Sequence, residues 1–380
     1  MKVPLLDLSR IHQPVLADMQ KAAADVLADG RYILGPNVKA FEEEMASACQ
    51  VEHAVGVSNG TDALRLALMA LHRLHGGGTV ITTPFTFIAT AEAVVAAGFD
   101  VAFADVNPDT ALLDPEAVES LITPETVGIV PVHLFGQCVD MDPLEALAKK
   151  HGLWIVEDNA QATGALYKGR TAGAMGDAGC FSFFPSKNLG GVGDGGLVIS
   201  NRQDVAELCR SGRRHGASVE RYRHDFIAGN FRLDELQAAI LRVKLPHLAA
   251  WNLERTEVAD RYLRLFAEAG LLESRSVRPL ARQEGSTHVY HQFVVRVDAR
   301  DRVLHGLREA GIGVAVYYPI PLNRQEAFGA VIAQRFECPN SLALADEVLA
   351  LPVFPGLTEE EQRYVVETLS GLVNEGEKLR

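Results

Sequence analysis

Short runs of apolar residues alternate with amphipathic helical patterns between residues 78 and 200. The apolar runs have the length of buried strands and occupy residues 78–82, 101–104, 128–132, 153–156, 179–183 and 197–200. Helical patterns lie between them at residues 89–97, 115–122 and 143–151, and Asp114-Pro115 and Asp142-Pro143 are typical N-cap and N1 pairs. Strands that alternate with helices in this way predict an α/β fold with a mostly parallel, doubly wound sheet.

The pattern changes in the C-terminal part of the chain. A long helical stretch covers residues 233–271 and is broken at Pro246, and residues 289–296 then alternate like a sheet strand. We therefore predict a large domain over residues 1–245, which includes the N-terminal segment, and a smaller α+β domain over residues 246–380. A chain of 380 residues that is 48% hydrophobic is long enough to bury two cores.

Composition excludes several classes of protein. A net charge of -13 argues against a nucleic-acid binder, since phosphate backbones favour an excess of Lys and Arg. No segment has the length of a membrane span, and the first residues lack the apolar stretch of a secretory signal. The five cysteines show no CxxC spacing, which suits reduced thiols in a cytoplasm, with neither disulfides nor zinc. His288 and His291 should point to opposite faces of a strand, so we expect no metal site.

Lys187 is the most informative residue. It lies in a glycine-rich, nearly uncharged segment, residues 179–196. A lysine in such a setting loses its proton readily, and its neutral amine can bind a carbonyl cofactor covalently. The alternative is a surface lysine in a glycine turn.

Asp158 follows the apolar run 153–156 and should lie at the carboxyl end of a central strand, the edge at which open α/β sheets bind ligands. A carboxylate there is what a pyridoxal phosphate (PLP) enzyme needs to keep the pyridine nitrogen protonated. Glu157 and Asp158 could instead form an ordinary polar loop.

Residues 55–64 read as a strand, a turn and a helix start. The unpaired N–H groups of a helix start favour an anion, and Gly60 with the Thr61 hydroxyl would let a phosphate approach. A plain N-cap at Thr61 without a ligand explains the same pattern.

These three motifs occur together with characteristic segments at residues 83–90, 132–136, 229–239 and 317–321. The set resembles the DegT/StrS family of nucleotide-sugar aminotransferases, which are fold-type I PLP enzymes, over nearly the whole chain. The resemblance implies an aspartate-aminotransferase-like fold, with a mostly parallel sheet in the large domain and a smaller C-terminal domain.

The resemblance also implies roles for single residues. Lys187 would hold the cofactor covalently and then move the substrate proton, with Asp158 on the pyridinium nitrogen. Gln161 would lie near the phenolic oxygen, and Phe87 would stack on the ring, although Phe85 competes for that role and Phe87 could be core. The remaining residues assigned to cofactor binding are Gly60, Thr61, Asp62 and Ser182, together with Asn230 from the neighbouring subunit, which makes a homodimer part of the active site.

The reaction implied is amino transfer from an amino acid, glutamate by our expectation, to a nucleotide-linked keto-sugar in amino-sugar biosynthesis. Residues 193–196 and 318–322 favour a ketone at C3, whereas Asn323-Arg324 departs from the pair expected for that subgroup. Sugar dehydratases of the same family replace the lysine with histidine, and a non-catalytic regulator would keep only the fold.

Two further groups are open to two readings. His133 and His215 are candidates for substrate contacts, with a satisfied core histidine as the alternative. The basic residues at 210–224 could meet a diphosphate or carboxylate, or form a solvated helix end and loop.

Overall fold

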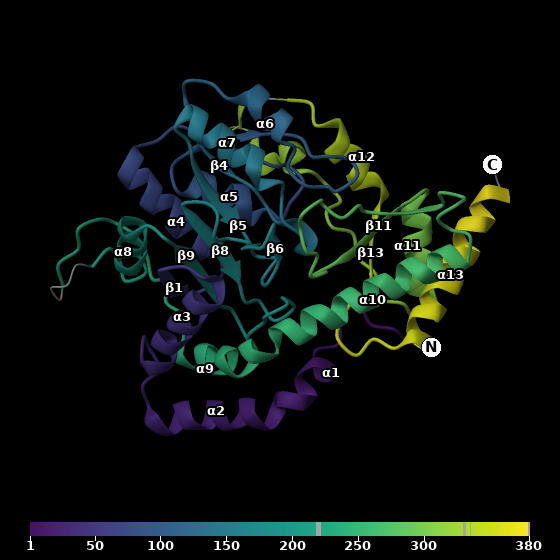
Figure 1. The fold of residues 1–380 in the computed structure, drawn as a ribbon, viewed down its shortest axis with the longest axis horizontal. Coiled ribbons are helices and arrows are strands. Elements are labelled where there is room, and N and C mark those ends of the chain that lie inside the picture. Colours follow the sequence, from purple (N-terminus) through teal and green to yellow (C-terminus); the bar gives the residue numbers. More distant parts are fainter. Residues whose placement is uncertain (218–221, 330–331, 335, 379–380) are drawn as a thin grey trace.

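An eight-stranded sheet forms the centre of the larger part of the molecule (Figure 1). The structure is a computed structural model that describes residues 1–217, 222–329, 332–334 and 336–378. From one edge to the other the strands are β1 (His53–Val57), β9 (Gly196–Ser200), β8 (Ala178–Ser182), β5 (Trp154–Asp158), β4 (Thr126–Val130), β2 (Thr79–Thr82), β3 (Asp100–Phe103) and β12 (Ile332–Gln334).

The sheet is mostly parallel, as predicted. Every neighbouring pair from β8 to β12 is parallel, and β9 is antiparallel to both of its neighbours. Successive residues of one strand enter different cores: Val156 packs with one cluster and Ile155 with another. The sheet is therefore buried on both faces, which explains why its strands read as continuous apolar runs.

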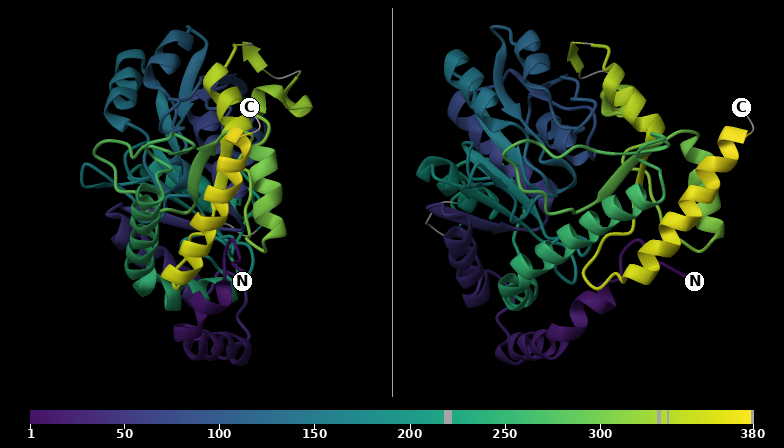
Figure 2. Two further views of the ribbon diagram at one scale, coloured as in Figure 1. Left: turned by 90° about the vertical axis from the view of Figure 1, so that its right-hand side faces the viewer. Right: turned by 45° about the vertical axis from the view of Figure 1, so that its right-hand side comes forward.

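Helices cover both faces of this sheet (Figures 1 and 2). The helix α4 (Gly60–His75) packs on β8 and β9. On the same face α5 (Ala89–Ala96) contacts β2 and β3, and α8 (Gln203–Gly212) contacts β1 and β9. On the other face α6 (Pro115–Leu121) and α7 (Met141–His151) contact β2 and β5. A hairpin of β6 (Leu166–Tyr167) and β7 (Arg170–Thr171) lies close to α7, and a short turn η2 (Leu134–Gly136) precedes α7 in the chain.

An arm of helices joins the two parts of the molecule. It consists of α9 (Glu235–Lys244), the turn η3 (Leu245–His247) and α10 (Leu248–Glu268), so the predicted break at Pro246 is confirmed. The N-terminal elements lie along this arm or beside β1: α1 (Leu8–His12), η1 (Gln13–Val15), α2 (Leu16–Asp29) and α3 (Pro36–Cys49).

The C-terminal part has its own antiparallel sheet of β10 (Val277–Pro279), β11 (Phe293–Val297) and β13 (Val348–Leu351). Its helices and turns are α11 (Arg300–Glu309), η4 (Leu322–Arg324), η5 (Glu326–Phe328), α12 (Pro339–Glu347) and α13 (Glu359–Lys378). Val3, Ile11 and Met19 from the N-terminal segment share the core of this part. Among the described residues, no helix is both long and apolar enough to cross a membrane.

Two local predictions and one alternative interpretation differ from the structure. Asp114 caps α6 as predicted, but α7 begins at Met141, and Asp142 lies inside its first turn. Thr61 is not an N-cap, because the side chain of Asn59 caps α4 through the Asp62 N–H, 2.8 Å away. The expected strand over residues 289–296 begins only at Phe293, since the chain turns at Tyr290, where φ is +43°.

Candidate active site

The loop between β8 and β9 carries Lys187. The loop is tight, because the Lys187 N–H donates to the Phe184 carbonyl (2.8 Å) and the Gly191 N–H donates to the Phe183 carbonyl (2.7 Å). The Lys187 amine has no hydrogen bond or ion pair with any residue that the structure describes. Burial lowers the pKa of this amine to about 8, and the negative charge of Asp158 opposes that shift. Lys187 is thus a desolvated amine that is free to react.

Asp158 ends the central strand β5, as predicted. Its side chain is 5% exposed and accepts hydrogen bonds from the Thr90 hydroxyl (2.7 Å) and the Ala160 N–H (3.1 Å). Burial raises the pKa of this carboxyl, whereas the two donors and the charge of Lys187 lower it. The acid and the amine therefore attract each other across the same edge of the sheet.

The start of α4 forms a cup beside this edge. Gly60 lies so close to β8 that a methyl group in place of its hydrogen would be 2.6 Å from the Cβ of Ser182. The Asp62 carboxylate accepts from Ser58 and from Asn59 (2.8 Å), and the Asp62 N–H is taken by Asn59. No acceptor among the described residues takes the N–H groups of Gly60 and Thr61. These two N–H groups are therefore available to bind an anion at the start of the helix.

Gln161 is fixed in one orientation near Asp158. Its Oε1 accepts from the Phe135 N–H (2.9 Å) and its Nε2 donates to the Tyr318 hydroxyl (2.9 Å). The Tyr318 ring centroid lies 6.3 Å from that of Phe87, which is 55% exposed, whereas Phe85 is fully buried. Phe87 therefore presents its ring outside the core, and Phe85 packs within it.

Two residues of this constellation are absent from the sequence-based prediction. Thr90 holds Asp158, and Tyr318 holds Gln161. Both lie within segments that carry the family resemblance, but their partners are far away in the chain. Only the fold brings each hydroxyl to its partner.

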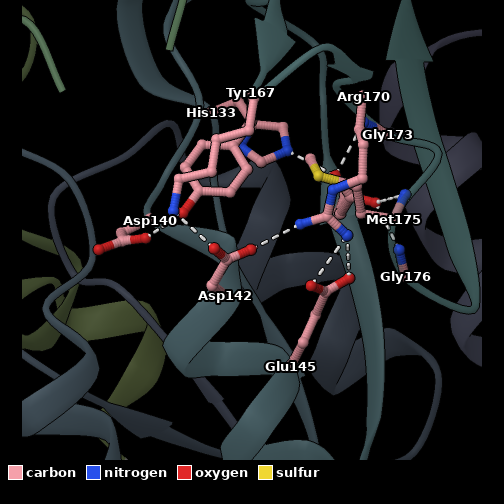
Figure 3. Close-up of polar contacts among 11 residues, drawn as sticks. His133, Asp140, Asp142, Glu145, Tyr167, Arg170, Gly173, Met175 and Gly176 are labelled. Atoms are coloured by element: carbon pink, nitrogen blue, oxygen red, sulfur yellow. Dashed lines mark hydrogen bonds and ion pairs between the residues drawn. The ribbon is translucent and has the colours of Figure 1, made fainter. Parts of the chain in front are cut away.

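His133 is not available for a substrate contact. It is fully buried; its Nδ1 accepts from the Val139 N–H (3.2 Å), so Nε2 carries the proton and donates to Glu157 (2.8 Å). The N–H groups of Gly173, Met175 and Gly176 also donate to Glu157 (Figure 3), at 2.8, 2.6 and 2.6 Å. Glu157 is therefore a structural carboxylate that fixes the end of β5, and the core reading of His133 is the correct one.

The basic segment that follows α8 is only partly exposed. Arg213 is buried and binds Glu42 and the Gly56 carbonyl (2.9 Å), so it supports β1 instead of meeting a ligand. His215 and Asn230 are exposed, and Asn230 forms a backbone bridge with Arg214. Arg221 lies outside the described residues.

His288 and His291 belong to the loop that precedes β11. The ring of His288 stacks on Tyr290 (3.7 Å between centroids), and its Nδ1 accepts from the Tyr290 N–H (3.0 Å). Burial lowers the pKa of His288 to about 3. The described residues contain no group of three or more side chains placed to hold a metal ion.

The arrangement suits PLP. The free amine of Lys187 can bind an aldehyde, the buried carboxylate of Asp158 can pair with a pyridinium nitrogen, and the N–H groups of Gly60 and Thr61 can bind a phosphate. The narrow space between Gly60 and Ser182 brings the helix start against the strand edge that carries Asp158. The three functional groups of one PLP molecule thus find three partners at one edge of the sheet.

Comparison with known proteins gives consistent matches over nearly the whole chain. The sequence profile of the DegT/DnrJ/EryC1/StrS aminotransferase family matches residues 15–370. A UDP-N-acetyl-3-dehydro-alpha-D-glucosamine 3-aminotransferase of Acidithiobacillus ferrooxidans is 44% identical, over 94% of this chain and 95% of that one. A "pleiotropic regulatory protein" of Geobacillus stearothermophilus is 43% identical, over 97% and 98% of the two chains.

A solved structure has the same fold. Streptomyces venezuelae DesV, crystallised in complex with a ketimine intermediate, superimposes with a TM-score of 0.92 at 39% identity and covers 98% of each chain.

Proposed function

The chain belongs to the DegT/DnrJ/EryC1/StrS aminotransferase family and is a PLP-dependent aminotransferase; from that premise we propose which substrates it takes and which residues act on them. The reaction is amino transfer to a nucleotide-linked keto-sugar in amino-sugar biosynthesis. The single observation that carries the proposal is the desolvated, unpaired amine of the half-buried Lys187, which shares one edge of the sheet with the buried carboxylate of Asp158.

Bound PLP supplies an aldehyde for a covalent link and a ring that accepts electrons. Asp158, oriented by Thr90, would keep the ring nitrogen protonated, and the start of α4 with Ser182 would hold the phosphate. Lys187, once released, would take a proton from one substrate carbon and return it elsewhere. With a pKa of about 8, a useful fraction of its amine is unprotonated near neutral pH, as such a base requires. Proton transfer of this kind contributes roughly 10²–10⁴ in rate.

We assign the acceptor ketone to C3 of the sugar. Two observations support this assignment. The Acidithiobacillus relative is named for a 3-dehydro sugar, and residues 193–196 and 318–322 of this chain favour a ketone at C3. Glutamate is the donor that we propose, following the resemblance described above. We also propose a homodimer in the cytoplasm, in which Asn230 of one subunit completes the site of the other; all five cysteines are free and buried, which agrees with a reducing compartment.

The name of the Geobacillus relative raises a regulatory role as the alternative. A regulator needs no reactive amine, whereas here the Lys187 amine is desolvated and unpaired. The dehydratases of the family lack this lysine. We therefore favour amino transfer over both.

The visible spectrum of the purified protein tests the proposal. We expect an absorption band from the PLP–lysine link, its loss on addition of glutamate, and its return with a 3-keto-sugar nucleotide. Return of the band only with a 4-keto-sugar nucleotide, and not with a 3-keto-sugar nucleotide, would contradict the C3 assignment. A protein that gains no band with added PLP would favour the regulator.

A further inference from the structure

Lys244, the last residue of α9, is a buried cation outside the site described above. It is 2% exposed, and its Nζ donates to the Gly190 carbonyl and lies 2.9 Å from His12 Nε2. Its Nζ is also 5.8 Å from the ring centroid of Trp251. Within the described part of the chain, no carboxylate lies within ion-pair distance of it.

A buried lysine without a carboxylate is unusual, because removing an ammonium group from water is unfavourable unless it is well bound. Burial lowers the pKa of Lys244 to about 8 and that of His12 to about 4, so His12 is neutral and accepts the hydrogen bond. A methionine would fill a similar volume without this penalty. The amine must therefore do something that an apolar side chain cannot.

One partner of Lys244 belongs to the loop between β8 and β9 that carries Lys187, called the catalytic loop below. Gly190 is three residues after Lys187, and the same loop has two more ties to the helical arm. Gln237 of α9 accepts from the Val192 N–H (2.9 Å), and Asn252 of α10 accepts from Asn188 Nδ2 (2.7 Å). The arm of α9 and α10 thus holds the loop on the C-terminal side of Lys187 at three points.

The other partner belongs to the N-terminal segment. His12 ends α1, and α1 is bound to the C-terminal part by Arg10, which makes two hydrogen bonds of 2.8 Å to Glu361. The backbone of Val3 pairs with Gly311 and Gly313 (3.0 and 2.7 Å). A continuous set of polar contacts therefore leads from the C-terminal part through α1 and Lys244 to the loop of Lys187.

We propose that Lys244 is a positioning residue that ties the loop carrying Lys187 to the N-terminal segment through the Gly190 carbonyl and His12. Docking of α1 then helps to order the catalytic loop. The effect on catalysis rests on the proposed function, whereas the effect on the loop does not.

Hydrogen–deuterium exchange of residues 184–192 tests the proposal in the full-length protein, with and without PLP. We expect Lys244→Met to speed exchange in this loop about tenfold, as expected for loss of a hydrogen bond from a charged donor. His12→Ala should produce a smaller increase, and the double variant should exchange no faster than Lys244→Met alone, because both changes break one connection. Arg242→Met is the matched control: Arg242 lies on the same helix but binds Glu44 and Asn37, so loop exchange should not change.

Kinetics of the loaded enzyme give the second readout. Lys244→Met should lower kcat about tenfold and leave the KM for the amino donor within about twofold, since a misplaced loop slows proton transfer and not binding. Unchanged loop exchange in Lys244→Met, or additive effects in the double variant, would overturn the proposal. If Lys244→Met does not fold, the His12→Ala variant provides the test. Exchange of residues 184–192 in this variant at the wild-type rate would overturn the proposal. Loop exchange that responds as expected in a protein without amino transfer would instead refute the proposed function.

Discussion

At the scale of single residues, the site depends on two ionisable groups that share a desolvated edge of the sheet. Burial disfavours charge on both: Asp158 is the group that favours the charged form of Lys187, whereas the charged form of Asp158 is favoured first by the Thr90 hydroxyl, then by the Ala160 N–H and by Lys187. Sequence alone could place this pair, because a strand end and a glycine-rich loop are local signals. It could not supply Thr90 or Tyr318, whose roles arise from contacts between distant segments. The roles of Phe87, Gln161 and Asn230 toward the cofactor remain predictions.

Thr90→Val tests the setting of Asp158. The Thr90 hydroxyl donates to the ionised carboxylate and so lowers its pKa. Without it the pKa of Asp158 rises further, and the acidic limb of the activity profile should move to higher pH, with a loss in kcat of about tenfold near neutrality. Thr82→Val is the control, because the buried Thr82 hydroxyl donates only to the Val130 carbonyl (2.7 Å). Equal profiles for the two variants would count against the role of Thr90.

The reactivity of Lys187 should follow its lowered pKa. Only the neutral amine attacks an aldehyde, so the rate at which the apoprotein captures PLP should rise with pH and reach a plateau above about 8. Cyanoborohydride trapping between about pH 6 and 10 measures this rate, with exposed lysines of ordinary pKa near 10.4 as the internal comparison. A midpoint near that ordinary value would show that Lys187 is not desolvated in the apoprotein.

At the scale of elements, sequence predicts most of the central sheet. The apolar runs 78–82 and 153–156 become β2 (Thr79–Thr82) and β5 (Trp154–Asp158), since strands buried on both faces have a clear signal. The sequence pattern does not predict β12, which joins the sheet by pairing Ile332 with Val101. It also places a strand through Tyr290, where the chain instead turns to let Asn188 reach the Val289 carbonyl (2.9 Å). These failures share one cause, which is that tertiary contacts override local pattern.

Gly60→Ala tests the fit of α4 against β8. The added methyl group would lie 2.6 Å from the Cβ of Ser182, so the first turn of the helix must move. We expect PLP to bind about tenfold more weakly, because overpacking displaces the N–H groups that we propose as the phosphate site. Pyridoxal, which has no phosphate, should bind almost unchanged in an absorbance titration. Gly371→Ala, where nothing lies within 4 Å, is the control. Equal weakening of both ligands would refute a phosphate site at this helix start.

At the scale of the whole molecule, the N-terminal segment packs with the C-terminal part. The chain as a whole is acidic, with a net charge of -13. The division near residue 245 remains a prediction, and several elements cross it: α1 and α2 contribute Ile11 and Met19 to the C-terminal core, and β12 joins the central sheet. The two parts are thus tied in several places beyond the arm of α9 and α10.

Shared active sites can be tested by mixing two inactive variants. If Asn230 serves the partner's site, a hybrid of Lys187→Ala and Asn230→Ala chains has one site with both changes and one with neither. Random exchange of subunits should therefore restore about a quarter of wild-type activity. Each variant refolded alone provides the control. No recovery in a mixture shown by mass spectrometry to contain hybrids would mean that Asn230 acts within its own chain.

The central claim is that the Lys187 amine is the group that binds PLP. Borohydride reduction of the holoenzyme fixes any such link, and peptide mapping then locates it. The account predicts one pyridoxyl label, on Lys187, and none in Lys187→Ala treated in the same way. A label on another lysine of the wild-type protein, or no label at all, would contradict it.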